Sequence, residues 1–177
     1  GLEFASGVPG TVGGALYMNA GAHDQSTAAV VCEVTAVNAT GEVVTLTQDD
    51  MDFSYRSSRL QKEPGLIAVK TKMRLQAAPE KEVRDRMRMF MDKRRRTQPI
   101  GTKNAGSVFK NPPGDFAGRL VEAAGCKGMT VGDAIVSPMH ANFIINRGEA
   151  TADDVRRLIE KVQATVYERF GVVLEPE

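Results

Sequence analysis

The sequence predicts an α+β fold. Its first half is rich in β-branched residues, and its second half mixes helical patterns with short β-like segments. Pro79 lies where the composition changes, so we place the boundary there, between residues 1–78 and residues 79–177. A chain of 177 residues can form one ordinary domain or two small ones. The 42% hydrophobic and 25% charged residues are typical of a soluble globular protein.

The first half is predicted to contain a hairpin and a further strand. Residues 30–46 form two β-rich runs around the turn residues of 38–41, a pattern typical of a β-hairpin. Thr47, followed by Asp50, predicts a capped helical turn. Residues 66–75 mostly alternate between apolar and polar, which predicts another strand.

The second half is predicted to begin with two helices. Apolar residues at helical spacing place the first helix between Pro79 and about Arg95. Asp115 is expected to cap a short second helix, which Gly125 ends.

A β-like stretch, a long helix and a terminal strand complete the second half. Residues 141–146 are the β-like stretch, and residues 172–177 read as a short apolar strand that carries two carboxylates. Thr151 and Asp154 begin the long helix, and Gly171 is a natural stop for it. Its apolar stripe consists of Val155, Leu158, Ile159, Val162, Val166 and Phe170.

Charge and composition argue against several function classes. The net charge of +1 gives no general attraction to nucleic acid. The basic cluster at residues 93–96 closes a predicted helix without interleaved aromatic residues, so we interpret it as a solvated helix end or a contact for phosphates. No apolar run approaches the roughly 18 residues of a membrane span. The first residues do not resemble a signal peptide.

The cysteines and histidines do not suggest a metal centre. Cys32 and Cys126 are isolated from one another, as are His23 and His140, so neither a disulfide framework nor metal-ligand spacing is present. Two isolated cysteines are most consistent with reduced thiols in a cytoplasmic protein.

Residues 104–112 are the most informative stretch for function. Gly106 can adopt backbone conformations that are closed to other residues, so the hydroxyl of the following Ser107 can be directed at a ligand. Lys110 and Asn111 place a cation and an amide within a few residues of that hydroxyl. This combination suits an anionic ligand that must receive a proton, although an ordinary turn with a solvated serine would look the same in isolation.

The Gly-rich segment at residues 7–15 is a second candidate for ligand binding. Its glycines allow the backbone to approach a ligand closely and its amides to converge on a phosphate. It matches neither the dinucleotide fingerprint nor a Walker loop, and tight turns use glycine as often.

Together these segments resemble one family. The sequences GVPGTVGGALYMNAGA, YRSS, AGSVFKNP, SPMHANFIIN and LEPE occur in this order at residues 7–22, 55–58, 105–112, 137–146 and 174–177. They resemble the UDP-N-acetylenolpyruvoylglucosamine reductases (MurB), flavoenzymes of bacterial cell-wall synthesis. The resemblance implies that residues 1–78 are part of a two-lobed FAD-binding domain of the vanillyl-alcohol-oxidase (PCMH) type. It implies that residues 79–177 form a linking helix and a substrate-binding domain.

Members of the family carry an N-terminal region with another Gly-rich flavin-phosphate loop, before the point that matches the start of this chain. We therefore expect the chain to be a C-terminal part of a longer enzyme, and to be inactive and weak in FAD binding on its own.

The resemblance also implies a reaction and its residues. NADPH reduces FAD, and hydride then passes to UDP-N-acetylglucosamine enolpyruvate, giving UDP-N-acetylmuramate for peptidoglycan. Ser107 would be the proton donor, Arg56 the cation beside the substrate carboxylate, and Glu177 the third catalytic group, with Glu175 as the second candidate for that role. The flavin-binding residues would be Val8, Pro9, Gly10, Thr11, Gly13, Gly14 and Ala15. The substrate-binding residues would be Tyr55, Lys110 and Asn111.

Two alternatives remain open at this stage. One is another flavoprotein oxidoreductase of the vanillyl-alcohol-oxidase type. The other is a non-enzymatic module that binds a phosphorylated ligand or nucleic acid through the basic helix end. The sequence does not indicate an oligomeric state.

Overall fold

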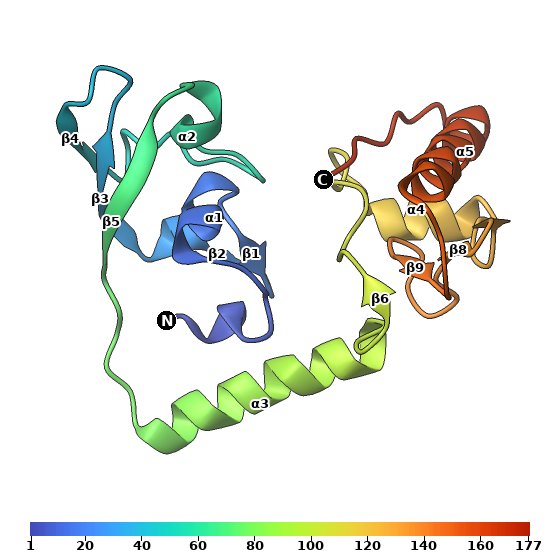
Figure 1. Ribbon diagram of the computed structural model, residues 1–177. Helices are drawn as coiled ribbons and strands as arrows, with labels where there is room; N and C mark the ends of the chain where they lie inside the picture. Colours follow the sequence, from blue (N-terminus) through green and yellow to red (C-terminus); the bar gives the residue numbers. More distant parts are fainter. The chain divides into compact units, whose positions relative to one another are not determined.

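The computed structural model describes all residues, 1–177, and divides into two compact units (Figure 1). Unit 1 comprises residues Gly1–Asp92 and unit 2 comprises Lys93–Glu177. Helix α3 (Glu80–Thr97) contains the division between them. The boundary predicted at Pro79 precedes this helix and stays a prediction, because the helix itself is shared by both units.

Unit 1 is built on a three-stranded antiparallel sheet of order β4-β3-β5. Its strands are β3 (Val31–Val37), β4 (Val43–Thr47) and β5 (Ile67–Met73), so the predicted hairpin and third strand are confirmed. The hairpin turn is held by Asn38, whose Oδ1 accepts hydrogen bonds from the backbone amides of Thr40 and Glu42. The predicted capped turn is also present, since the Asp50 carboxylate accepts from the backbone and hydroxyl of Thr47.

The core of unit 1 lies between this sheet and two short helices, α1 (Val12–Tyr17) and α2 (Arg59–Lys62). The central strand contributes buried apolar side chains, because both of its neighbours pair with it and shield it from water. The buried side chains of this core are Leu16, Val31, Val34, Ala36, Leu46, Met51, Leu60 and Leu66. The remaining elements are the strands β1 (Gly21–Ala22) and β2 (Gln25–Ser26) and the 3₁₀ helices η1 (Glu3–Ala5) and η2 (Thr27–Ala29).

Helix α3 confirms the helix predicted from the spacing of apolar residues and extends it to Thr97. None of its residues is buried. Phe90 on this helix stacks on the ring of His23, with the ring centroids 4.1 Å apart. The basic cluster lies in its last turn, as predicted, where cations interact favourably with the helix dipole. No helix in the structure combines the length and the apolar character that crossing a membrane would require.

Unit 2 contains a four-stranded antiparallel sheet of order β6-β9-β8-β7. Its strands are β6 (Lys103–Asn104), β7 (Thr130–Val131), β8 (Ala134–Val136) and β9 (Ile144–Asn146). Two helices complete the unit, α4 (Ala117–Ala123) and α5 (Ala152–Phe170) (Figure 1). Leu120, Val136, Leu158, Val162 and Leu174 are among the side chains that pack into its core.

The long helix was predicted well from its ends. Thr151 and Asp154 form a reciprocal capping box, and Gly171 ends α5 with a φ of 68°. The prediction that Phe170 belongs to the apolar stripe is wrong, because this side chain is 37% exposed and lies beyond the last buried turn. The guanidinium of the adjacent Arg169 lies over the Phe170 ring instead, 5.7 Å from the ring centroid.

Two predictions about local structure in unit 2 need correction. Phe116, not Asp115, is the N-cap of α4. The Asp115 carboxylate is engaged by the Arg119 side chain and by the backbone N–H of Phe116, and these hydrogen bonds lower the pKa of Asp115 to about 2. Residues 172–177 form a single antiparallel bridge, between Phe109 and Pro176, rather than a strand, because only two backbone hydrogen bonds, with Val108 and Lys110, pair them with the neighbouring segment.

Candidate active site

The end of the chain pairs with the segment that follows Ser107. The backbone N–H of Glu177 donates to the carbonyl of Val108 at 2.9 Å, and the N–H of Lys110 donates to the carbonyl of Glu175 at 2.8 Å. These two bonds flank the bridge between Phe109 and Pro176. The tail acid is therefore opposite Val108, the residue next to Ser107.

Ser107 is presented by a loop whose shape depends on Gly106 and Asn104. Gly106 has a φ of 92°, as the sequence suggested, and its N–H donates to Asn104 Oδ1 at 3.0 Å. Asn104 Nδ2 donates in turn to Thr102 Oγ1 at 2.9 Å and to the carbonyl of Pro99 at 3.2 Å. Ser107 itself is exposed, and its hydroxyl makes no hydrogen bond within the protein. The hydroxyl is thus available to a ligand.

Ser107 and Glu177 line the same pocket. This hollow of about 530 Å³ lies entirely within unit 2. Apolar side chains from β9 and α5 form part of its wall, namely Ile144, Val155 and Ile159. Its size is suited to a small molecule, and an apolar wall with a few polar groups is typical of such sites.

A buried asparagine fixes the backbone on the other side of the Ser107 loop. Asn142 is 4% exposed, and its Oδ1 accepts from the N–H of Phe109 at 2.9 Å. Its Nδ2 donates to the carbonyl of Phe109 at 2.8 Å, and its own carbonyl accepts from the N–H of Val108 at 2.9 Å. Asn142 therefore takes the place of a neighbouring strand for these two residues. The predicted β-like stretch begins only at Ile144 as regular strand.

His140 supports this asparagine. Its Nδ1 accepts from the backbone N–H of Asn142 at 3.2 Å, and its ring meets that of Phe143 edge to face at 4.8 Å. Burial lowers the pKa of His140 below its usual 6.5, which favours the neutral ring that can accept this bond. The prediction that His140 and Asn142 are hydrogen-bonded structural residues is confirmed.

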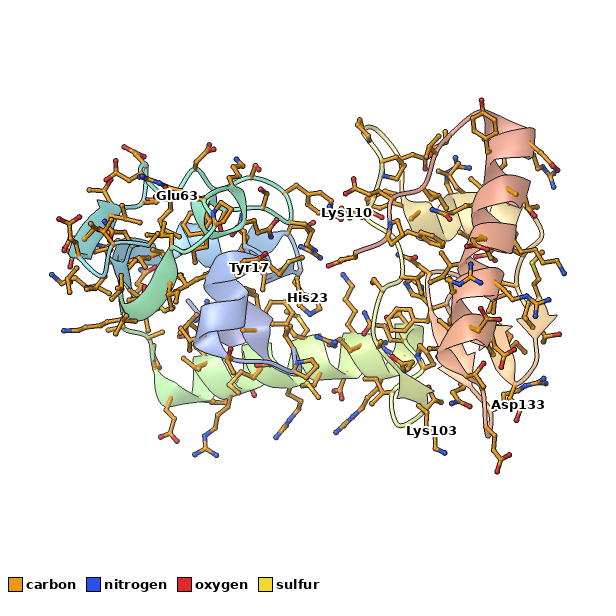
Figure 2. All side chains as sticks on the ribbon, turned by 45° about the horizontal axis from the view of Figure 1, so that its top comes forward. Tyr17, His23, Glu63, Lys103, Lys110 and Asp133 are labelled. Atoms are coloured by element: carbon orange, nitrogen blue, oxygen red, sulfur yellow. The ribbon has the colours of Figure 1, made fainter.

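Lys110 and Asn111 both have partners within unit 2. The Lys110 ammonium is 2.5 Å from Glu175 Oε1 (Lys110 is labelled in Figure 2). Asn111 Oδ1 accepts from the N–H of Ala117 at 3.0 Å, in the first turn of α4. This bond satisfies one of the amides that a helix N-terminus leaves unpaired.

In unit 1, Tyr55 and Arg56 occupy the tip of a tight turn. Ser54 and Ser57 pair across its base through N–H to carbonyl bonds of 3.1 and 3.2 Å. Arg56 has a φ of 53°, which is unusual for a residue with a side chain, and its guanidinium lies over the Tyr55 ring at 5.0 Å. Such strain is retained where the surroundings hold it in place, and it is common at functional sites.

Both ends of this turn are anchored on the segment that follows the Gly-rich loop. Asn19 Nδ2 donates to the carbonyl of Ser54 at 2.9 Å. The fully buried Ser58 donates through Oγ to the carbonyl of Tyr17 at 2.8 Å, at the end of α1 (Tyr17 is labelled in Figure 2). The Arg56 turn and the Gly-rich loop are thus mechanically connected within unit 1.

The Gly-rich loop itself is open to solvent. Thr11 caps α1 by accepting from the N–H of Gly14 at 3.0 Å. A Cβ placed on Gly10 would meet nothing within 4 Å, and one placed on Gly13 would meet only Thr11 Oγ1 at 3.8 Å. The space that side chains would fill is therefore free, which fits a cofactor lying against the loop. The seven predicted flavin contacts, residues 8–11 and 13–15, are all exposed or half-buried.

The structure brings together some of the predicted site residues. Ser107 and Glu177 share one pocket, with Lys110 on the same backbone pairing. Tyr55 and Arg56 belong to unit 1, and their meeting with Ser107 stays a prediction. The sequence reasoning missed the supporting side chains Asn19 and Ser58. Both lie inside the segments that carried the family resemblance, which is the only signal that could have singled them out.

Family models connect these features to a class of protein. A model described as "FAD binding domain" matches residues 1–47, and one described as "UDP-N-acetylenolpyruvoylglucosamine reductase, C-terminal domain" matches residues 98–177. These two matches place the chain in a class of proteins that combine an FAD-binding domain with a reductase C-terminal domain.

Individual relatives agree with this class. The chain is 52% identical over 177 residues to UDP-N-acetylenolpyruvoylglucosamine reductase 2 of Symbiobacterium thermophilum, and 51% identical over 179 residues to the reductase of Caldicellulosiruptor saccharolyticus. Each match covers 100% of this chain and 57% of the relative. The crystal structure of the reductase (MurB) from Thermus caldophilus matches with a TM-score of 0.86 and 39% identity, covering 100% of this chain and 63% of that one.

The chain is similar over its whole length to the UDP-N-acetylenolpyruvoylglucosamine reductases (MurB), which confirms the resemblance. The α+β fold predicted from the sequence is confirmed as well. The chain spans a little over half the length of the curated relatives that it matches.

Proposed function

We propose that this chain takes part in the NADPH-dependent reduction of UDP-N-acetylglucosamine enolpyruvate to UDP-N-acetylmuramate, with FAD as cofactor, in cytoplasmic peptidoglycan precursor synthesis. The names of the relatives support this assignment. The observation that carries it is the shared pocket of Ser107 and Glu177, two groups from distant parts of the sequence. The family match does not support the two alternatives that the sequence left open.

The flavin contacts would come from the exposed Gly-rich loop, residues 8–11 and 13–15. When bound there, FAD supplies the hydride that reduces the enol ether carbon of the substrate. The loop's part is to let a flat ring system approach the backbone, since its glycines present no side chain.

Ser107 would give its proton to the substrate carbon next to the one that receives hydride. A hydroxyl is a weak acid, so this role needs nearby groups that stabilise the alkoxide or return its proton. Glu177, in the same pocket, would serve that purpose. The proton would thus leave Ser107 Oγ and form the new C–H bond, and the alkoxide would be reprotonated through the acid.

Arg56 would hold the substrate carboxylate with its planar fork and stabilise the charge that develops beside it. Its positive φ supports this role, because a strained arginine at a turn tip indicates a conformation kept for function. Tyr55 and Asn111 would complete the substrate site.

The test is the substitution Ser107→Ala in the intact protein. We expect stopped-flow absorbance to show near-normal reduction of FAD by NADPH. Reoxidation of the flavin by the enolpyruvyl substrate should slow by about 10²- to 10⁴-fold, the usual contribution of a general acid. Ser26→Ala is the control, because its hydroxyl makes no side-chain hydrogen bond and lies outside the pocket. A parallel fall of both half-reactions in Ser107→Ala would rule out the proton-donor role.

A further inference from the structure

We propose that Lys110 and Glu175 form a latch that positions Glu177 beside Ser107, so that Lys110 is a positioning residue rather than a contact for the substrate diphosphate. The inference rests on the proposed function for its catalytic consequence, but the latch itself is a structural claim that can be tested separately.

The tail is held at Leu174 and again at its last three residues. Leu174 is 1% exposed in the core of unit 2, and its carbonyl accepts from Gln163 Nε2 on α5 at 2.8 Å. Beyond Leu174, the backbone bonds to Lys110 and Val108 hold the last residues. The core thus anchors the tail at Leu174, and the pairing with residues 108–110 holds its last residues.

Lys110 and Glu175 lie directly across this pairing from one another. The bridge between Phe109 and Pro176 makes Lys110 the partner of Glu175, and Val108 the partner of Glu177. Opposite charges at facing positions of an antiparallel pair stabilise the pairing. The ammonium and carboxylate are 2.5 Å apart, with side-chain exposures of 27% and 70%. The ion pair therefore reinforces the backbone pairing to which Glu177 belongs.

The same geometry argues against a diphosphate role for Lys110. A carboxylate at hydrogen-bond distance neutralises much of the cation's field, and a phosphate would have to displace it. A substrate contact would not require Glu175, whereas a latch requires both residues equally. This difference makes the two roles separable by mutation.

The structural test uses Lys110→Met, Glu175→Gln and the charge exchange Lys110→Glu with Glu175→Lys in the intact protein. Amide hydrogen exchange at Glu177 should be about two- to fivefold faster in each single variant, the effect of losing one exposed ion pair. The exchanged pair should return to within about twofold of the original rate. Lys127→Met is the matched control, because Lys127 pairs with Glu122 at 2.7 Å, with exposures of 29% and 59%, in the same unit. Unchanged exchange at Glu177 in both single variants would overturn the latch.

The catalytic test uses the same variants. Lys110→Met and Glu175→Gln should each slow flavin reoxidation by about two- to fivefold, leave reduction by NADPH and substrate affinity unchanged, and be rescued by the charge exchange. Weaker, more salt-dependent substrate binding in Lys110→Met alone would assign Lys110 to the diphosphate and overturn the proposal. If exchange at Glu177 responds as expected but Ser107→Ala does not slow reoxidation, the proposed function fails and the latch stands.

Discussion

Asn142 pairs through its side chain with both backbone polar groups of Phe109, accepting from the N–H at 2.9 Å and donating to the carbonyl at 2.8 Å. The two residues are 33 positions apart in sequence, and both are buried. One side chain thus replaces a sheet neighbour for the backbone that carries Ser107 and receives the tail.

We expect Asn142→Ala to destabilise the protein strongly. It leaves a buried N–H and a buried carbonyl without partners, and each such loss costs about 1–3 kcal/mol. The free energy of unfolding, measured by urea denaturation, should fall by about 2–5 kcal/mol.

Asn142→Asp separates the two bonds of this pair. An aspartate can still accept from the Phe109 N–H but cannot donate to its carbonyl, and it buries a charge. It should therefore be no more stable than the alanine variant. A change below about 0.5 kcal/mol in Asn142→Ala, the usual range for surface substitutions, would contradict the structural role.

Gly106→Ala tests the backbone conformation before Ser107. The φ of 92° is unfavourable for alanine, although a Cβ there would meet nothing within 4 Å. Strain of this kind costs about 1–2 kcal/mol, and relaxing it would turn the serine away from the pocket. We expect a loss of about 1 kcal/mol in stability together with slower flavin reoxidation.

Gly128→Ala is the matched control for this variant. Its φ is 78°, a Cβ there also meets nothing within 4 Å, and it lies outside the Ser107 pocket. It should lose similar stability and keep the reoxidation rate. Equal rates in the two variants would show that the Gly106 conformation is not needed to aim Ser107.

His140 gives the stability of unit 2 a pH dependence. Because burial lowers its pKa in the folded protein below 6.5, the unfolded chain binds its proton first as the pH falls. The contribution of neutral His140 is fully present above pH 6.5 and is lost as the pH falls from there through the lowered pKa. The free energy of unfolding should therefore decrease between pH 7.5 and pH 5 by more than it does in His140→Gln.

The comparison with His140→Gln isolates this residue. Glutamine can also accept from the Asn142 N–H but does not titrate, and His23 is present in both proteins. Urea denaturation at a series of pH values provides the measurement. Parallel pH profiles for the two proteins would mean that His140 is not kept neutral by its surroundings.

Local signals made much of the fold predictable. The capping box of Thr151 and Asp154 and the stop at Gly171 are encoded within a few residues, and both were confirmed. The cap of α4 was misplaced because Asp115 has a competing partner, Arg119, one helical turn away. The local sequence does not show whether the Asp115 carboxylate will bind the helix amides or the Arg119 side chain.

The candidate site was harder to predict, because long-range pairing builds it. Ser107 and Glu177 were joined by family resemblance and not by any pattern that relates their positions. The clamp of Asn142 on Phe109 and the ion pair of Lys110 with Glu175 connect residues 33 and 65 positions apart. Neither pairing produces a repeating pattern of residue types from which it could be predicted.

Arg56→Gly tests whether backbone strain is retained for function. Arg56 has a φ of 53°, a region that costs a residue with a side chain about 1–2 kcal/mol and glycine almost nothing. We expect glycine to keep the turn between Ser54 and Ser57 and to raise the free energy of unfolding by up to about 1 kcal/mol. Flavin reoxidation should nevertheless slow, because the guanidinium proposed to hold the substrate carboxylate is gone.

Asp24→Gly is the control for this variant, because Asp24 has a φ of 61°, is exposed and makes no side-chain hydrogen bond. It should gain similar stability without slower reoxidation. Arg56→Lys keeps the charge and the strain but loses the planar fork, so its reoxidation rate should lie between those of the glycine variant and the original protein. If Arg56→Gly reoxidised at the original rate, the strained turn would have no part in catalysis, and the assignment of Arg56 to the substrate carboxylate would be wrong.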